Sequence, residues 1–212
     1  VIEKLERRRV EEPEETSFLP HLAEAYFDVG RVPEARETYR HLIELEPGNV
    51  PARMALARLQ VETESPHLAL PWLEQVNEID PGYAPAWAMR GTILAAGARF
   101  AESRPILERA IELDQRDPTL FLWLAKSEVG LREWSSAVEH CDRYFERGGA
   151  DPEAYLVRAR ARAKLGRVED AQADLAEALR RNARFPGQVK EIRRLIDRAQ
   201  RRAGGTQKEG GS

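Results

Sequence analysis

The stretches ELEPGN (44–49) and EIDPGY (78–83) decide the fold, because they are near copies of one another 34 residues apart. Another step of 34 residues reaches IELDQRD (111–117), and a step back from Pro47 reaches Pro13. Self-similarity at a fixed period of this length is the sequence signature of a repeat protein. The period divides most of the chain into five blocks, which are residues 16–49, 50–83, 84–117, 118–151 and 152–185.

Small residues recur at two fixed places in these blocks. Two helices approach closely only where neither carries a bulky side chain, because protein interiors are close-packed. The register therefore predicts that each block is a pair of helices in contact at these two places. The residues are Ala23, Ala57, Gly91, Ala125 and Ala159 at the eighth place, and Ala35, Ala69, Ser103, Ala137 and Ala171 at the twentieth.

The apolar residues inside each block have helical spacing. In the first block, Leu19, Leu22, Ala23 and Tyr26 fall at i, i+3, i+4 and i+7, which is one face of a helix. Glycines near the middle of four blocks predict tight turns between paired helices. These glycines are Gly30, Gly97, Gly130 and Gly166. The predicted helix pairs are 16–29 and 33–46, 51–63 and 66–79, 84–97 and 101–114, 118–130 and 134–147, and 152–165 and 168–181.

This pattern resembles that of tetratricopeptide repeat (TPR) proteins, and the resemblance covers residues 16–185. It implies an all-α fold, a right-handed α-solenoid of helix-turn-helix repeats. Residues 1–15 resemble the second helix of a truncated earlier repeat. Residues 186–202 carry an apolar face and are expected to form a C-terminal capping helix, which a stacked array needs on its last repeat. The Gly-rich residues 203–212 are expected to be a disordered tail, either native or a cloning remnant.

The resemblance also implies a binding groove, lined by the second, fifth, ninth, twelfth and thirteenth residues of each block. Both methionines lie at or beside these places, and methionine adapts to varied apolar contacts. Three cations at the ninth place would suit an acidic or amphipathic segment. The candidate groove residues are Phe27, Met54, Arg58, Val61, Met89, Thr92, Leu122, Trp123, Lys126, Leu156 and Arg160. Pro20, Glu24 and Ala55 stand where chaperone-binding TPR domains have Lys and Asn, so a chaperone co-factor role is not expected.

The sequence offers little that indicates catalysis. The histidines lack the spacing of metal ligands, and there is no phosphate-binding glycine loop or nucleophile elbow. Cys141, the only cysteine, lies in the register of large apolar residues and is interpreted as a core thiol. We therefore expect no enzyme activity, no cofactor, no metal site and no small-molecule substrate.

Charge is unevenly distributed along the chain, although the net charge is only -3. Residues 1–50 carry 7 basic and 12 acidic side chains, whereas residues 151–212 carry 15 basic and 9 acidic ones. Nucleic-acid or acidic-partner binding through the basic C-terminal part is therefore an alternative. The interleaved carboxylates and the overall pI of about 5.9 favour a solvated, ion-paired surface instead.

The favoured function is that of a non-catalytic scaffold or adaptor that binds a peptide segment or helix of a partner protein in its groove. The other alternative is a regulatory or targeting domain cut from a larger enzyme or a membrane-anchored assembly factor. Self-association stays possible. No run of about 18 apolar residues is present, so we expect no membrane span. A cytoplasmic location is expected, or an exported or membrane-tethered one if an N-terminal segment is missing.

Overall fold

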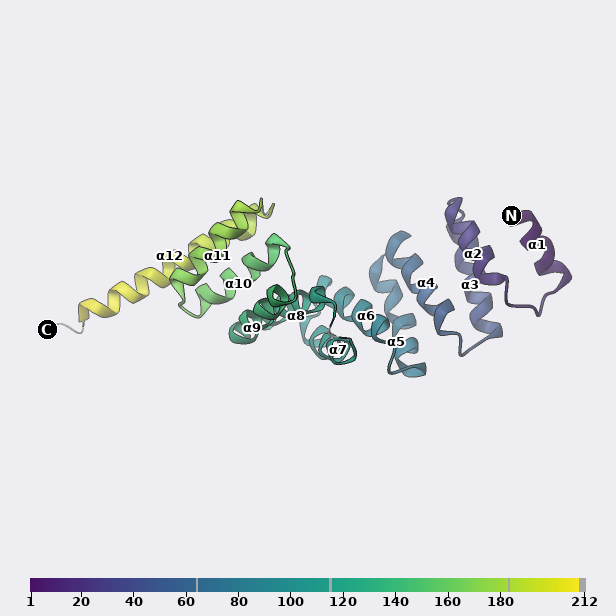
Figure 1. Ribbon diagram of the computed structural model, residues 1–212, viewed down its shortest axis with the longest axis horizontal. Helices are drawn as coiled ribbons and strands as arrows, with labels where there is room; N and C mark the ends of the chain where they lie inside the picture. The colour runs from purple at the N-terminus through teal and green to yellow at the C-terminus, as the bar shows by residue number, and fades with distance from the viewer. Residues whose placement is uncertain (64, 115, 183, 210–212) are drawn as a thin grey trace. The chain divides into compact units, whose positions relative to one another are not determined.

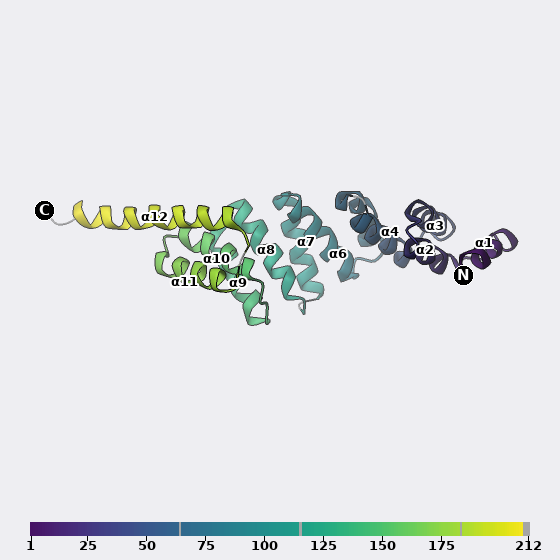
Figure 2. The same cartoon turned by 90° about the horizontal axis from the view of Figure 1, so that it is seen from above.

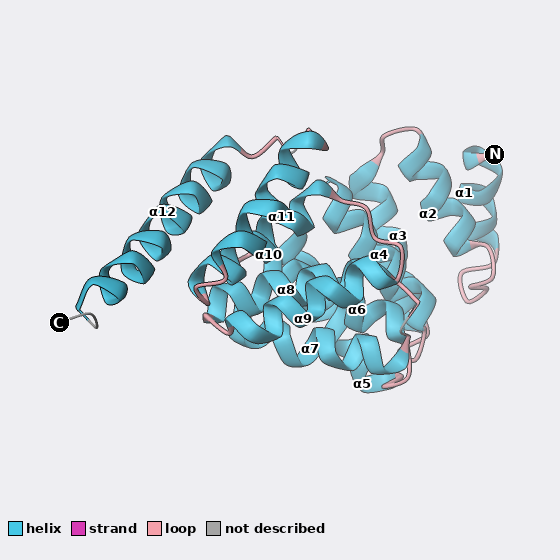
Figure 3. Ribbon diagram, turned by 60° about the vertical axis from the view of Figure 1, so that its left-hand side comes forward, coloured by secondary structure: helices cyan, strands magenta, loops and turns pink. Residues whose placement is uncertain are grey.

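The computed structural model describes residues 1–63, 65–114, 116–182 and 184–209, with side chains to Arg202. Within these ranges the regular structure is helical and contains no strand (Figure 3). The predicted all-α class is confirmed. The chain forms two compact units, Val1–Ile93 and Leu94–Ser212, which we call unit 1 and unit 2.

Unit 1 begins with a helix that packs on the first complete helix pair. Ile2 and Leu5 of α1 contact the apolar core, and the Tyr26 hydroxyl donates to the Glu6 carboxylate at 2.5 Å. The assignment of α1 to an earlier repeat stays a prediction. The helices of this unit are α1 (Ile2–Glu11), α2 (Leu19–Asp28), α3 (Val32–Leu45), α4 (Val50–Thr63), the 3-10 turn η1 (Pro66–Ala69), α5 (Leu70–Ile79) and most of α6 (Ala84–Ala96) (Figure 1).

Unit 2 contains the remaining helix pairs and a long final helix. In Figure 2 this last helix lies alongside the pair before it, and it packs on both members of that pair. The helices are α7 (Phe100–Leu113), α8 (Pro118–Leu131), α9 (Trp134–Glu146), α10 (Pro152–Lys164), α11 (Val168–Arg180) and α12 (Pro186–Glu209). No helix in the described part of the chain is both long enough and apolar enough to cross a membrane.

The small-residue register is buried, as its predicted place between paired helices requires. Nine of its ten members are Ala or Ser and are fully buried at 0% exposure, and Gly91 is buried as well. Larger apolar residues surround them in clusters that join a helix pair to the next helix of the same unit. Burying one Leu, Ile or Phe side chain contributes roughly 1.5–3 kcal/mol, so these clusters supply most of the favourable free energy of folding.

The turn glycines are only partly as predicted. Gly30 and Gly166 have positive φ angles of 78° and 76°, which glycine adopts without strain. Gly97 lies in its predicted turn, although the left-handed residue there is Ala98. In the turn after α8 the left-handed residue is Arg132, so the prediction for Gly130 is wrong. Gly130 lies inside α8, where a Cβ would come within 2.1 Å of the Phe100 ring. Glycine at this position therefore leaves room for the Phe100 ring to pack against α8.

Two helix starts are displaced from their predicted positions by proline. Proline is favoured in the first turn of a helix because its missing N–H has no partner there. Pro20 accordingly stands in the first turn of α2, which begins at Leu19 rather than at residue 16. Pro66 and Pro71 divide the second helix of the next block into η1 and α5.

The final helix is longer than the capping helix predicted from the sequence. Its apolar residues Val189, Ile192 and Ile196 join the core formed by α10 and α11, which is the capping contact expected. The backbone stays helical to Glu209, whereas the expected tail began at residue 203. Gly204 and Gly205 weaken a helix by about 1 kcal/mol each, but no proline stops it. Residues 210–212 of the expected tail lie outside the described residues.

Candidate functional site: a charged cavity in unit 2

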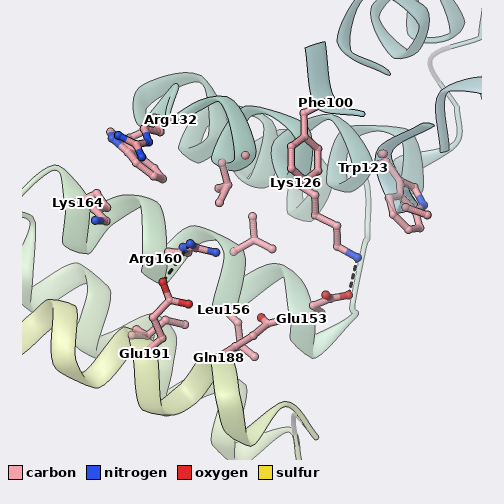
Figure 4. A pocket seen from close by; sticks show the side chains of 17 residues that line it. Phe100, Trp123, Lys126, Arg132, Glu153, Leu156, Arg160, Lys164, Gln188 and Glu191 are labelled. Atoms are coloured by element: carbon pink, nitrogen blue, oxygen red, sulfur yellow. Dashed lines mark hydrogen bonds and ion pairs between the residues drawn. The ribbon is translucent and has the colours of Figure 1, made fainter. Parts of the chain in front are cut away.

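The largest hollow described in unit 2 is an open cavity of about 1070 Å³ (Figure 4). Its walls come from α8, α10 and α12, and the ends of α6, α7 and α9 complete it. Four basic side chains, two carboxylates and three aromatic side chains line it. They are Lys126, Arg132, Arg160, Lys164, Glu153, Glu191, Phe100, Trp123 and Trp134.

The same sequence signal, an aspartate followed by a proline, begins both α8 and α10. Asp117 and Asp151, one period apart, each precede a proline and cap a helix N-terminus. Their carboxylates accept hydrogen bonds at 2.8 Å from the backbone N–H groups of Thr119 and Glu153. Such caps contribute about 1 kcal/mol and fix where a helix begins. The ninth residues of both blocks consequently face the same cavity.

Lys126 occupies one end of the cavity. Its Nζ atom lies 2.5 Å from Oε2 of Glu153 on α10 and 4.3 Å from the centre of the Trp123 ring. Both charged side chains are only about one-fifth exposed, at 21% and 18%. The pair therefore joins α8 to α10 and leaves the Trp123 ring as an aromatic wall (Figure 4).

Arg160 forms the second ion pair of the cavity, with the final helix. Its Nη2 atom lies 3.0 Å from Oε1 of Glu191 on α12, and both side chains are more than one-third exposed. An exposed pair of this kind contributes little to stability, with a median of about 0–1 kcal/mol. A competing carboxylate could replace Glu191 at small cost.

Arg132 and Lys164 lie at the opposite end from Trp123 (Figure 4). Both are exposed, and no carboxylate of the described residues forms an ion pair with either one. The Nζ atom of Lys164 lies 5.6 Å from the centre of the Trp134 ring. This end of the cavity is therefore cationic, whereas the Lys126 end is neutralised.

The floor of the cavity is apolar. Leu156 and Ile192 are 0% and 1% exposed, respectively, and belong to the core shared by α10, α11 and α12. The Phe100 ring packs directly against the backbone of Gly130, because glycine has no side chain there. This contact fixes the position of the ring. An apolar floor beneath charged walls provides both buried contact area and orientation for a ligand.

The structure brings together four of the predicted groove residues, namely Trp123, Lys126, Leu156 and Arg160, in this cavity. Leu122 does not line it; its side chain is 5% exposed and packs in the core with Phe121 and Cys141. The reason is its position on α8, where it faces the neighbouring helices rather than the cavity.

The remaining predicted residues lie in unit 1. Phe27 and Arg58 line a smaller hollow of about 190 Å³ together with three carboxylates, Glu24, Asp28 and Glu62. Met54 is 2% exposed and fills the core between α4 and α5, so it offers no surface for a partner. Three others are half-buried: Val61 and Met89 pack against the same core, and the Thr92 hydroxyl donates to the Met89 carbonyl at 3.0 Å.

Several lining residues were missed by the sequence reasoning. Glu153 stands at the second place of its block, which the family register includes, and could have been found. Arg132 and Trp134 lie at the turn between α8 and α9, outside that register. Glu191 belongs to the final helix, where the i, i+4 spacing from Leu195 back to Glu191 was the available signal.

A second group of charges lies between the helices rather than in the cavity. Arg158 donates to both oxygens of Asp174 at 3.0 and 2.7 Å and also to Asp142. Arg162 donates to Asp174 at 2.8 Å. Asp174 is 4% exposed, so these arginines are structural. The basic side chains of α10 are thus divided between two faces of the helix.

Two titratable groups flagged by the sequence are also internal. Cys141 is fully buried, and burial raises the pKa of its thiol, so the thiolate needed for nucleophilic chemistry is suppressed. His140 Nδ1 lies 2.8 Å from Oε2 of Glu128, whose pKa is raised by burial against the opposing effect of His140. No group of three or more potential metal ligands occurs in the part of the chain that the structure describes.

Comparison with known proteins agrees with this architecture. Three family models, all described as tetratricopeptide repeat, match residues 26–93, 88–154 and 152–185. They cover the chain without a gap from residue 26 to residue 185. This chain belongs to the tetratricopeptide repeat family. TPR proteins are in general protein-interaction scaffolds. No curated protein sequence matches the chain.

Solved TPR structures superpose well on it at low sequence identity. YrrB, described as a TPR protein with an unusual peptide-binding site, is 17% identical with a TM-score of 0.74, covering 95% of this chain and 100% of its own. MamA is 19% identical with a TM-score of 0.72, covering 78% and 90%. A TPR protein from Parabacteroides merdae is 18% identical with a TM-score of 0.65, covering 94% and 78%. At these identities the likeness concerns the fold alone.

Proposed function

We propose that this TPR protein is a non-catalytic scaffold that binds a segment of another protein in the unit 2 cavity. The observation that carries the proposal is the lining, in which aromatic side chains and cations surround a buried apolar floor. Aromatic and arginine side chains are enriched where proteins bind one another, because they combine large contact area with directed hydrogen bonds.

The size and openness of the cavity support a segment rather than a small metabolite. The hollow is bounded by several helices yet open to solvent, so a peptide chain can enter and leave it. YrrB, which shares the fold, is described as having a peptide-binding site. A short helix or an extended peptide fits the exposed surface that stacked helices provide.

The test is to fill the cavity and measure peptide binding. Peptides are first selected on the whole protein from a displayed random library, and their affinities are measured by fluorescence anisotropy. Ala96 lines the cavity and is exposed, so Ala96→Trp places an indole in the hollow without overpacking the core. We expect at least a tenfold loss of affinity, since about 1.4 kcal/mol of lost contact suffices for that factor.

Ala101→Trp is the matched control. Ala101 is exposed, as Ala96 is, but it lies in the first turn of α7 and does not line the cavity. We expect this variant to bind the selected peptides as the parent does. Circular dichroism of both variants checks that the helices are intact. Equal affinity of the parent and Ala96→Trp would show that the peptides bind elsewhere and would refute the proposal.

A further inference from the structure

A second hollow adjoins the cationic end of the cavity in unit 2. It has a volume of about 390 Å³ and lies between α10 and α12. Lys164 lines both hollows, so the two adjoin each other at this residue beside the final helix. Its lining contains three cations, Lys164, Arg198 and Arg202, and no carboxylate among the described residues.

The final helix turns a single face toward both hollows. One side of this helix is formed by residues that follow one another at intervals of three or one, namely Gln188, Glu191, Ile192, Leu195, Arg198, Ala199 and Arg202. The two groups differ in charge, because Glu191, the only carboxylate among these seven residues, lies in the larger cavity. The distance along the axis from Glu191 to Arg202 is roughly 16 Å, which about five residues of an extended peptide would cover.

We propose that this hollow holds a run of acidic residues from the same partner segment whose apolar part lies in the larger cavity. The inference rests on the proposed function and adds to it the orientation in which the partner segment lies. The apolar residues of the segment contact Phe100, Trp123 and the floor. The carboxylates that follow them pass Arg132 and Lys164 and end beside Arg198 between α10 and α12.

Charge complementarity favours an acidic peptide over a nucleic acid. Binding of single strands generally requires aromatic side chains on which bases stack, whereas the uncharged lining of the smaller hollow is Ala163, Gly166, Leu195 and Ala199. Carboxylates on a flexible peptide can instead approach the exposed cations individually.

The experiment uses two fluorescein-labelled peptides of identical composition and the whole protein. In one peptide a half containing Trp and Leu is followed by about five Glu, which when extended cover the roughly 16 Å from Glu191 to Arg202. In the other the same residues are interspersed. We expect the segregated peptide to bind at least about fivefold more tightly at low salt, and the preference to fall as salt screens the exposed charges.

Charge reversal then locates the acidic half. Lys164→Glu with Arg198→Glu should weaken the segregated peptide at least about tenfold, since attraction becomes repulsion at two positions. Arg193→Glu with Arg194→Glu is the matched control, because these residues lie on the same helix, change the net charge equally and line a separate hollow with Leu179. The control variant should retain most of the affinity.

A photo-crosslinker at the acidic end of the segregated peptide should label α12, and one at the apolar end should label α7 or α8.

Several outcomes would overturn the inference. Equal binding of the two peptides, or equal losses in the two double variants, would show that only net charge matters. Tighter binding of an oligothymidylate than of the segregated peptide would assign the hollow to nucleic acid. Concentration-dependent dimers that disappear in Lys164→Glu with Arg198→Glu would assign it to a second copy. The effect of Ala96→Trp on the selected peptides is measured separately, so the proposed function can survive each of these results.

Discussion

Two groups of charges in unit 2 differ in their surroundings, those between the helices and those in the cavity, and α10 carries members of both. Arg158 and Arg162 face the interior, where Asp142 and Asp174 fix them. Arg160 and Lys164, on the other side of the same helix, face the cavity and are paired weakly or not at all. The difference teaches that the carboxylates around a cation, and not the local density of arginine in the sequence, determine whether it stabilises the fold or is available to a partner.

The interior group should show the largest effect on stability. Asp174→Ala leaves the partly buried guanidinium groups of Arg158 and Arg162 without their main partner. Breaking a buried ion pair by removing one member costs about 3–5 kcal/mol. We expect a clear fall in the melting temperature, measured by circular dichroism. A melting curve like that of the parent would mean that the interior charges contribute no more to stability than the cavity charges do.

Helix spacing on the same interior face should show the next largest effect. Ala159 is fully buried where α10 and α11 approach each other, so Ala159→Leu should destabilise the protein by about 1–3 kcal/mol through overpacking. The expected measurement is a lower denaturant midpoint. Ala173→Leu, at an exposed position of α11, is the control and should leave the midpoint nearly unchanged.

The cavity group should contribute little to stability. Arg160→Ala removes the exposed pair with Glu191, and we expect the free energy of unfolding to change by no more than about 1 kcal/mol. Affinity for selected peptides should fall in the same variant. A large loss of stability with unchanged peptide affinity would place Arg160 in the structural group.

The smallest effect should be a change in pH dependence at the buried Glu128. Its folded-state pKa is raised by burial, so its contribution to stability is complete below the unfolded pKa and is lost as the pH rises through the folded pKa. Glu128→Gln removes this loss. The stability of the variant relative to the parent should therefore increase as the pH is raised from about 4.5, near the unfolded pKa. Chemical denaturation at several pH values measures the difference, and a constant difference would contradict it.

The repeat period made much of the fold predictable. Because Pro47, Pro81 and the small residues lie in one register, the helix pairs and their contacts followed from the sequence, and most helix ends fell within two residues of their predicted positions. Local effects were harder to anticipate. Pro20 delays the start of α2, and Gly130 is small because of Phe100, which belongs to a different helix.

The cavity was predictable only in part. The ninth place of each block gave Lys126 and Arg160 because the caps at Asp117 and Asp151 repeat with the same period. Met54 fits the same register but is drawn into the core of α4 and α5, where a flexible thioether fills space. Glu191 and the cations near it depend on how α12 packs, and α12 lies outside the repeat.

The packing of α12 along the wall of both hollows has a consequence for dynamics. Within the described part of the chain it packs on α10 and α11, and we expect it to open with less free energy than helices that pack between two neighbouring pairs. A ligand that touches α10 and α12 together would favour the closed state of this end. Slower amide hydrogen exchange in residues 188–202 would then show that the two hollows are occupied, so the backbone of α12 would report on binding without an added label.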